Sequence, residues 1–174
     1  MTIASRPETA QVWEWLSEIP DPEIPVISLT DLGIIRDVAW DDDTLVVTVT
    51  PTYSGCPATS IINLDIEKAL REHGIEKLKL VRQLSPAWTT DWITPEAREK
   101  LKAYGIAPPV DGTAADGRLA ARIQRLGSNA PLIIECPRCH STKTEKVSQF
   151  GSTPCKANYR CLDCLEPFDY FKCI

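Results

Sequence analysis

The sequence contains no run of eighteen apolar residues, so we expect no membrane-spanning helix. Its first residues, MTIASRPETA, have neither the basic start nor the apolar stretch of a secretory signal, which predicts a cytoplasmic protein. There is also no glycine-rich phosphate loop and no dinucleotide-binding fingerprint. These absences give no support to a membrane protein, a secreted protein or a nucleotide-dependent enzyme.

Histidine is scarce, with only His73 and His140 in the chain. A nucleophilic cysteine in a hydrolase needs a histidine or another base beside it. The lone upstream cysteine, Cys56, begins a predicted helix whose far end carries His73, about 25 Å away at the usual rise per residue. The sequence therefore gives poor support to a Cys–His hydrolase.

The chain carries a net negative charge. Nineteen Lys and Arg side chains stand against 24 Asp and Glu, which gives −5 and a pI near 5.1. This balance argues against a protein that binds nucleic acid through phosphate contacts. The hydrophobic share of 43% and the charged share of 25% indicate a folded chain with one ordinary core and a small appendage.

Apolar periodicity predicts a small α+β domain over residues 1–84. The expected order is helix, strand, strand, helix, strand, over residues 5–19, 33–40, 45–50, 57–73 and 75–84. This order favours a small mixed sheet with packed helices. Residues 85–131 are expected to form an extension and linker, with a short helix after Thr94 and recurrent Gly and Pro over 105–118.

Six of the seven cysteines lie between residues 136 and 173. Four of them form two Cys-x-x-Cys pairs separated by 21 residues: Cys136 with Cys139, and Cys161 with Cys164. Each pair can point two thiolates at one ion, and two pairs complete a tetrahedral four-sulfur site. A unit of about forty residues buries little surface, so a metal has to contribute folding energy. We predict a zinc-ribbon-like domain at residues 132–174 with structural zinc.

Other metals remain open for this tail. A rubredoxin-like iron site uses the same four thiolates, and an iron–sulfur cluster could recruit Cys155 or Cys173. A closed four-sulfur zinc site has no free coordination position, which predicts a structural role. Six basic and five acidic side chains over residues 132–174 favour docking of a protein over binding of RNA.

Cys56 stands apart from the tail, in a segment that follows a predicted strand and precedes the helix at 57–73. At the N-cap of that helix, backbone N–H groups and the helix dipole would stabilise its thiolate. Gly55 permits close approach by another molecule, and Glu23 is a candidate acidic neighbour. Cys56 is therefore a candidate reactive or metal-binding thiol, and a small buried residue is the alternative.

The motifs DPEIPV at 21–26, DLGII at 31–35 and GCP at 55–57 resemble the SufT-like iron–sulfur assembly domain over about residues 8–84. Further segments extend the resemblance to nearly the whole chain and to the PaaD family. They are WTTDW at 88–92, YGIAPP at 104–109, FGSTPCK at 150–156 and EPF at 166–168. PaaD is the small D component encoded with the phenylacetyl-CoA epoxidase system of aerobic phenylacetate catabolism.

The resemblance implies a non-catalytic accessory component that assists iron–sulfur cluster or metal maturation of the epoxidase or its reductase. It places the family's motif cysteine at Cys56 and its acidic residue at Glu23, which would handle a transient iron ion or cluster. The implied partners are the oxygenase or reductase subunits, and a homodimer stays open. No Glu-x-x-His pair of a di-iron bundle occurs in the chain, which agrees with an accessory role.

Two alternatives remain at this point. The chain could be an iron-binding electron-transfer subunit of the epoxidase complex, with its tail carrying the iron. It could also be a zinc-ribbon scaffold in which Cys56 is inert. The sequence does not decide between zinc and iron in the tail.

Overall fold

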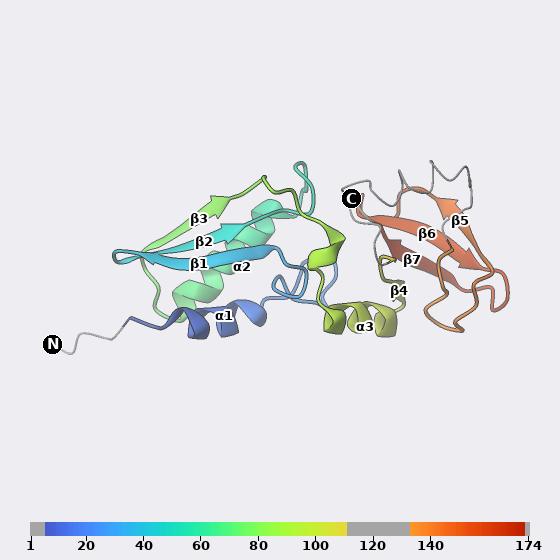
Figure 1. Ribbon diagram of the computed structural model, residues 1–174, viewed down its shortest axis with the longest axis horizontal. Helices are drawn as coiled ribbons and strands as arrows, with labels where there is room; N and C mark the ends of the chain where they lie inside the picture. Colours follow the sequence, from blue (N-terminus) through green and yellow to red (C-terminus); the bar gives the residue numbers. More distant parts are fainter. Residues whose placement is uncertain (1–5, 111–132, 173–174) are drawn as a thin grey trace. The chain divides into compact units, whose positions relative to one another are not determined.

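The computed structural model describes residues 6–110 and 133–172 (Figure 1). Contacts divide the chain into two units, Met1–Trp88 and Thr89–Ile174. Within the described residues, no helix is both long enough and apolar enough to cross a membrane.

The first unit is built on a three-stranded mixed sheet in the order β1-β2-β3. Strands β1 (Ile35–Asp41) and β2 (Thr44–Val49) are antiparallel, whereas β2 and β3 (Leu78–Arg82) are parallel. Parallel neighbours need a crossover, which here contains helix α2 (Thr59–Glu72). The predicted α+β class with a small mixed sheet and packed helices is confirmed.

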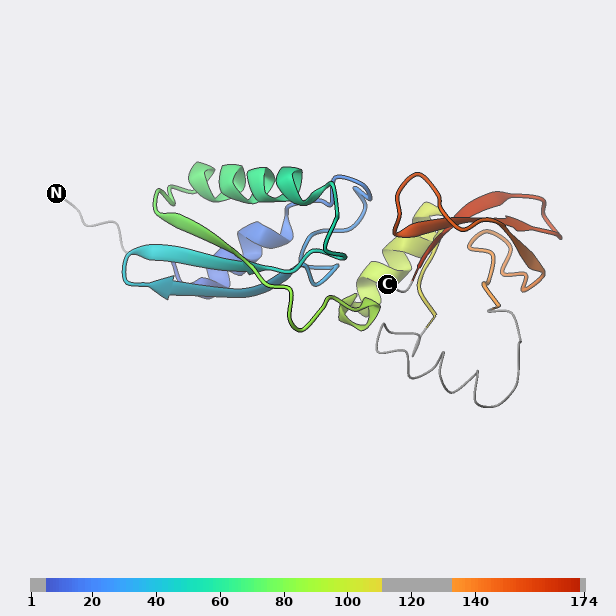
Figure 2. The same cartoon turned by 90° about the horizontal axis from the view of Figure 1, so that it is seen from above.

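The core of the first unit lies between the sheet and two helices, α1 (Thr9–Ser17) and α2, which pack on the same side of the sheet (Figures 1 and 2). Burial alternates along β2, so one face of the strand meets the helices. The buried helix positions recur at the spacing of one helical face. They are Val12 and Leu16 on α1, and Ile62, Ile66 and Leu70 on α2.

Helix α1 begins at Thr9, later than the expected residue 5, with Glu8 as an N-cap that makes no side-chain capping hydrogen bond. The preceding residues are held by the hairpin between β1 and β2 instead. Arg6 donates to the carbonyl of Asp42 at 2.8 Å, and Trp40 Nε1 donates to the carbonyl of Pro7 at 3.2 Å. These contacts keep residues 6 and 7 out of the helix.

The second unit is a four-stranded sheet in the order β4-β7-β6-β5. Strands β5 (Thr144–Ser148), β6 (Lys156–Cys161) and β7 (Pro167–Phe171) form an antiparallel meander, and β4 (Ile106–Ala107) pairs in parallel with β7. A single-turn helix η1 (Thr90–Trp92) and helix α3 (Pro95–Tyr104) precede β4. The predicted N-cap of α3 is confirmed, because the Thr94 side chain accepts from Ala97 N at 3.1 Å.

The expectation of a linker from residue 105 is wrong for its first residues. Gly105 ends α3 in a left-handed conformation, φ 94°, and its N–H returns to the last turn of the helix. The chain then enters the sheet, where Ile106 and Ala107 lie opposite Asp169 and Tyr170. Glycine is therefore a helix terminator here, and the segment after it contributes to the second core.

Candidate functional site

The four cysteines of the two Cys-x-x-Cys pairs converge in the second unit. Their sulfur atoms all lie within 4.8 Å of one another, with 3.8 Å between Cys136 and Cys164 and 3.5 Å between Cys139 and Cys161. Four sulfurs at about 2.3 Å from a tetrahedral zinc ion would be about 3.8 Å apart. The donor set and its spacing therefore fit a four-thiolate metal centre.

The backbone forms each pair as a tight turn. In the first, Cys136 N donates to Ser141 O at 2.9 Å and His140 N donates to Cys136 O at 3.0 Å. In the second, Cys161 N donates to Glu166 O at 3.0 Å, and Cys164 N lies 3.5 Å from the Cys161 sulfur. We call these two turns the knuckles, residues 136–141 and 161–166. Both place their first cysteine in the interior and their second at the surface.

The thiols of the cluster differ strongly in acidity. The Cys164 backbone N–H, followed by that of Asp163, stabilises the Cys161 thiolate and lowers the pKa of Cys161 to about 6. The Ser141 N–H favours the Cys139 thiolate, but hydrogen bonding with the Cys164 sulfur, together with burial, raises the pKa of Cys139 to about 12. One thiolate therefore forms readily and disfavours the next, so a bound cation is needed to hold all four as thiolates.

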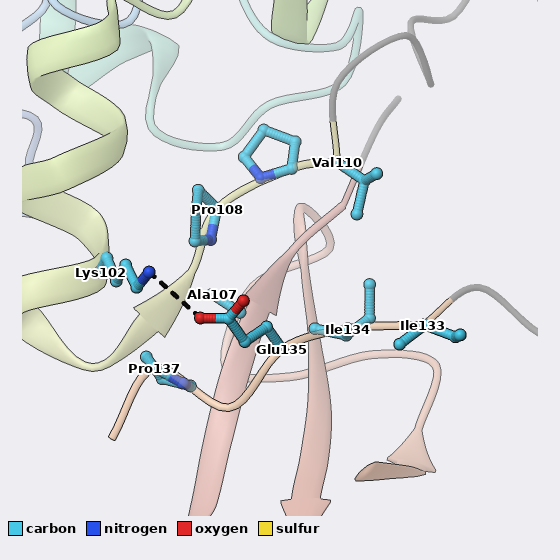
Figure 3. Close-up of a pocket in the computed structure, with 9 residues that line it drawn as sticks. Lys102, Ala107, Pro108, Val110, Ile133, Ile134, Glu135 and Pro137 are labelled. Carbon is cyan, nitrogen blue, oxygen red and sulfur yellow. Dashed lines mark ion pairs between the residues drawn. The ribbon is translucent and has the colours of Figure 1, made fainter. Parts of the chain in front are cut away.

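A short polar chain joins the first knuckle to α3. Glu135 accepts a hydrogen bond from His140 Nδ1 at 2.7 Å and pairs with Lys102 Nζ at 3.2 Å. The hydrogen bond to His140, and then that to Lys102, lower the pKa of the Glu135 carboxyl. Figure 3 shows the Lys102–Glu135 pair at the rim of a cavity of about 310 Å³, which Pro108 and Ile134 also line.

One tail cysteine that the structure describes, Cys155, does not belong to the four-sulfur cluster. Cys155 is buried, and Thr153 Oγ1 lies 2.9 Å from its sulfur. Cys173 lies outside the described residues. His140, which stands next to Cys139, turns its ring to Glu135 and is exposed.

Cys56 lies in the loop between β2 and α2, residues 50–58, and is half-buried. Its expected place at the helix N-cap is wrong, because α2 begins at Thr59 with Ala58 as N-cap. Cys56 N closes a turn onto Tyr53 O at 3.1 Å, and Pro57 disfavours helical backbone in the residue before it. The Cys56 carbonyl accepts from Thr59 Oγ1 at 2.9 Å, so the loop is tied to the first turn of the helix.

Glu23 lies in the loop between α1 and β1 and is half-buried. Asp21, which is buried, shapes this loop: its Oδ1 accepts from the N–H groups of Glu23 and Ile24, both at 2.9 Å. Both views place this loop and the Cys56 loop at the same end of the first unit (Figures 1 and 2). A hydrogen bond from Thr50 N to Ile34 O, 2.9 Å, ties the two segments together.

Two further residues of the Cys56 loop region were not among the sequence candidates. The Thr50 hydroxyl is buried and has no hydrogen-bond partner among the described residues, an arrangement that costs stability unless a ligand or water satisfies it. Arg82, at the end of β3, donates to the carbonyl of Ser54 within the loop. Thr50 ends the strand predicted over residues 45–50, whereas a lone arginine in a strand gives no sequence signal.

Comparison with known families identifies two domains. Residues 9–77 match an iron-sulfur cluster assembly protein family, and residues 122–172 match the PaaD zinc beta ribbon domain. The crystal structure of a DUF59 domain of unknown function from Bacillus anthracis has a TM-score of 0.50 at 25% identity and covers 53% of this chain and 89% of that chain. The zinc ribbon match and the four-thiol cluster fit structural zinc, as the sequence predicted.

Similar proteins extend these matches. An Fe-S protein maturation auxiliary factor of Bacillus subtilis, YitW, is 33% identical over 88 residues, 49% of this chain and 85% of that protein. A factor of the same description from Porphyromonas gingivalis is 35% identical over 88 residues, 49% of this chain and 83% of that protein. An Escherichia coli protein named as the D component of 1,2-phenylacetyl-CoA epoxidase is 50% identical over 173 residues, 99% of this chain and 97% of that protein. The chain therefore belongs to the PaaD family, which joins an iron–sulfur cluster assembly domain to a zinc beta ribbon.

Proposed function

We propose that this protein is an accessory maturation factor of a phenylacetyl-CoA epoxidase system and that it helps to load the iron–sulfur cluster of the reductase. The observation that carries the proposal is the union, in one chain, of an assembly-type domain with a cysteine on a surface loop and a four-thiol ribbon. Relatives named as an epoxidase component and as Fe-S maturation factors support the same role.

In the first unit, Cys56 and Glu23 are the proposed handling residues for iron or a cluster in transit. The Cys56 thiol is half-buried, and the residues on either side of it, Gly55 and Pro57, are exposed. A protein partner can therefore reach it. A thiolate with a carboxylate at the same end of the unit offers the ligand types that iron accepts. The buried Thr50 hydroxyl, which has no hydrogen-bond partner among the described residues, lies at the start of the same loop.

In the second unit, the proposed zinc ligands are Cys136, Cys139, Cys161 and Cys164. A closed four-sulfur site leaves no coordination position for substrate, so the ion would stabilise the fold and take no part in a reaction. The ribbon then serves as a docking module whose partners are the oxygenase or reductase subunits. We place this work in the cytoplasm and assign the protein no catalytic residue of its own.

Deleting the gene tests this proposal. The reductase purified from the deletion strain should carry less iron and labile sulfide per chain than the parent's, and chemical reconstitution should restore both. A matched deletion that expresses the protein from a plasmid controls for effects on neighbouring genes. A fully loaded reductase from the deletion strain would contradict the proposal.

A second function has one observation in its favour, since four thiolates at this spacing also suit an iron ion. The chain would then be an electron-transfer subunit of the epoxidase. Anaerobic purification with metal analysis separates the two, because iron–thiolate centres absorb visible light and zinc centres are colourless. A colourless protein with one zinc per chain supports the maturation factor, and a coloured protein with one iron per chain supports electron transfer.

A further inference from the structure

The loop that carries Cys56 leaves the sheet at the edge where β3 also ends. Strands β2 and β3 run parallel, with Val49 opposite Arg82, and Gln83 N continues the ladder to Val49 O at 2.9 Å. Because parallel strands bring their carboxyl ends to one edge of a sheet, the residue that ends β3 and the loop that follows β2 meet there.

Arg82 uses this position to contact the loop. Its guanidinium donates a hydrogen bond to the carbonyl oxygen of Ser54, 28 residues away in sequence and two residues before Cys56. Ser54 lies inside the turn that Cys56 N closes onto Tyr53 O. Arg82 therefore holds the turn from the side of the sheet, whereas Thr59 holds Cys56 from the side of the helix.

Apolar packing contributes little to the tip of this turn. Ser54 and Gly55 are both exposed, and a side chain at position 55 would meet only the Tyr53 ring, 3.9 Å away. Gly55 has no side chain and no left-handed φ, so the residue itself adds little restraint to the backbone. Hydrogen bonds to the backbone are therefore important for the position of the tip.

We propose that Arg82 is a positioning residue, which fixes the turn at 53–56 and thereby the direction in which the Cys56 thiol is presented to a partner. This inference rests on the proposed function, since it gives Arg82 a part in the work assigned to Cys56. The contact is exposed, so Arg82 should contribute to the order of the loop far more than to the stability of the fold.

The test uses the full-length, zinc-loaded protein with three substitutions. Arg82→Gln removes the positive charge and shortens the side chain, and Arg82→Lys keeps a charged donor without the planar guanidinium group. Lys79→Gln is the matched control, because Lys79 is an exposed cation on the same strand that pairs with Val46, away from the loop. Two rates are measured: amide hydrogen exchange over residues 53–56, and alkylation of Cys56 by iodoacetamide, followed by mass spectrometry of the Cys56 peptide.

Arg82→Gln should speed amide exchange in the loop by about threefold to tenfold, as expected for the loss of one hydrogen bond. The alkylation rate of Cys56 should change by a similar factor, Arg82→Lys should lie between parent and Gln, and the melting temperature should stay at the parental value. Lys79→Gln should match the parent in both rates. Equal rates in Arg82→Gln and Lys79→Gln would overturn the proposal, as would a lower melting temperature that Arg82→Lys fails to restore.

These rates are measured without any client, so they stand apart from the proposed function. If Arg82→Gln changes both rates and a Cys56→Ala strain still loads its reductase fully, the positioning role survives and the maturation role fails. If the rates do not change, the positioning role fails whatever the reductase contains.

Discussion

His140 and Leu165 occupy equivalent places in the two knuckles: each directly follows the second cysteine, and their φ angles are 61° and 63°. This left-handed conformation costs a residue with a side chain about 1–2 kcal/mol. Glycine adopts it freely, yet neither knuckle has glycine there. The repeated angle shows that the turn geometry needed to aim two sulfurs at one point overrides the local preference of these residues.

The first prediction follows from this strain. Leu165→Gly should stabilise the second unit by about 0.5–1 kcal/mol, the gain from relieved strain less the entropic cost of glycine. The Leu165 side chain is 68% exposed, so little packing is lost. Denaturant unfolding of the zinc-loaded protein measures the change. Leu162→Gly is the control in the same knuckle, since Leu162 has no left-handed backbone and should lose stability. Equal losses in both variants would contradict the account.

The second prediction concerns Cys136, which is fully buried in the cluster that forms the second core. Cys136→Ser should abolish stoichiometric zinc binding and unfold the second unit, including α3 and β4, because Ala107 of β4 belongs to the same apolar cluster. Limited proteolysis should cut after residue 89 and spare the first unit. Cys155→Ser, the control at a buried thiol outside the cluster, should retain one zinc per chain. Equal zinc in the Cys136 variant and the parent would refute the ligand assignment.

The third prediction concerns protons that leave the thiols when zinc binds. Without zinc the second unit is expected to unfold, so its thiols should have the ordinary pKa of about 8.5 and be mostly protonated at pH 7.5. In the folded ribbon the pKa of Cys161 is lowered to about 6, so this thiol ionises when the unit folds. Zinc binding should therefore release roughly three to four protons per ion at pH 7.5, and zinc affinity should fall as pH falls. Calorimetric titrations of the apo-protein in buffers of different ionisation enthalpy count the protons. Release of fewer than two protons per ion would contradict the assignment of four thiol ligands.

The fourth prediction concerns Gly55 and separates an effect on the stability of the fold from an effect on the binding of a partner. The position has no left-handed φ, and an added methyl group would meet only the Tyr53 ring in ordinary contact, so Gly55→Ala should leave the stability of the first unit unchanged or raise it by about 0.4–1 kcal/mol. If a partner approaches the loop closely, the same methyl group should lower cluster loading of the reductase. Gly74→Ala is the control: its φ of 85° predicts a loss of about 1 kcal/mol with normal loading. Normal loading in Gly55→Ala would argue against close approach at this residue.

Patterns of apolar residues and fixed spacings made most of the fold predictable. The alternation in β2 and the stripe on α2 follow directly from burial of one face, and two Cys-x-x-Cys pairs have few uses other than a shared metal site. The family resemblance stated from the motifs is confirmed by both domain matches and by the full-length relative.

The features that could not be predicted from the sequence depend on contacts between residues far apart in the chain. Gly105 and the residues after it have the composition of a linker, and only the β7 edge, more than sixty residues later, makes them a strand. Cys56 was expected at the helix N-cap because Pro57 suits a first helical position, but the hydrogen bonds around the turn at 53–56 moved the helix start to Thr59. The Arg82–Ser54 contact could not be predicted either, because it depends on the register of the parallel strands β2 and β3.

The most direct test of the central claim is the iron–sulfur content of the reductase from a strain that carries Cys56→Ala. Cys56 is half-buried, so the substitution should cost the fold about 1 kcal/mol at most, and normal protein abundance is the control. The maturation role predicts a reductase deficient in cluster, with activity restored by chemical reconstitution. An electron-transfer role predicts a normal iron–sulfur cluster in the reductase. It also predicts that epoxidase activity is lost when the tail cysteines are substituted. A full complement of cluster in the reductase of the Cys56→Ala strain would contradict the account.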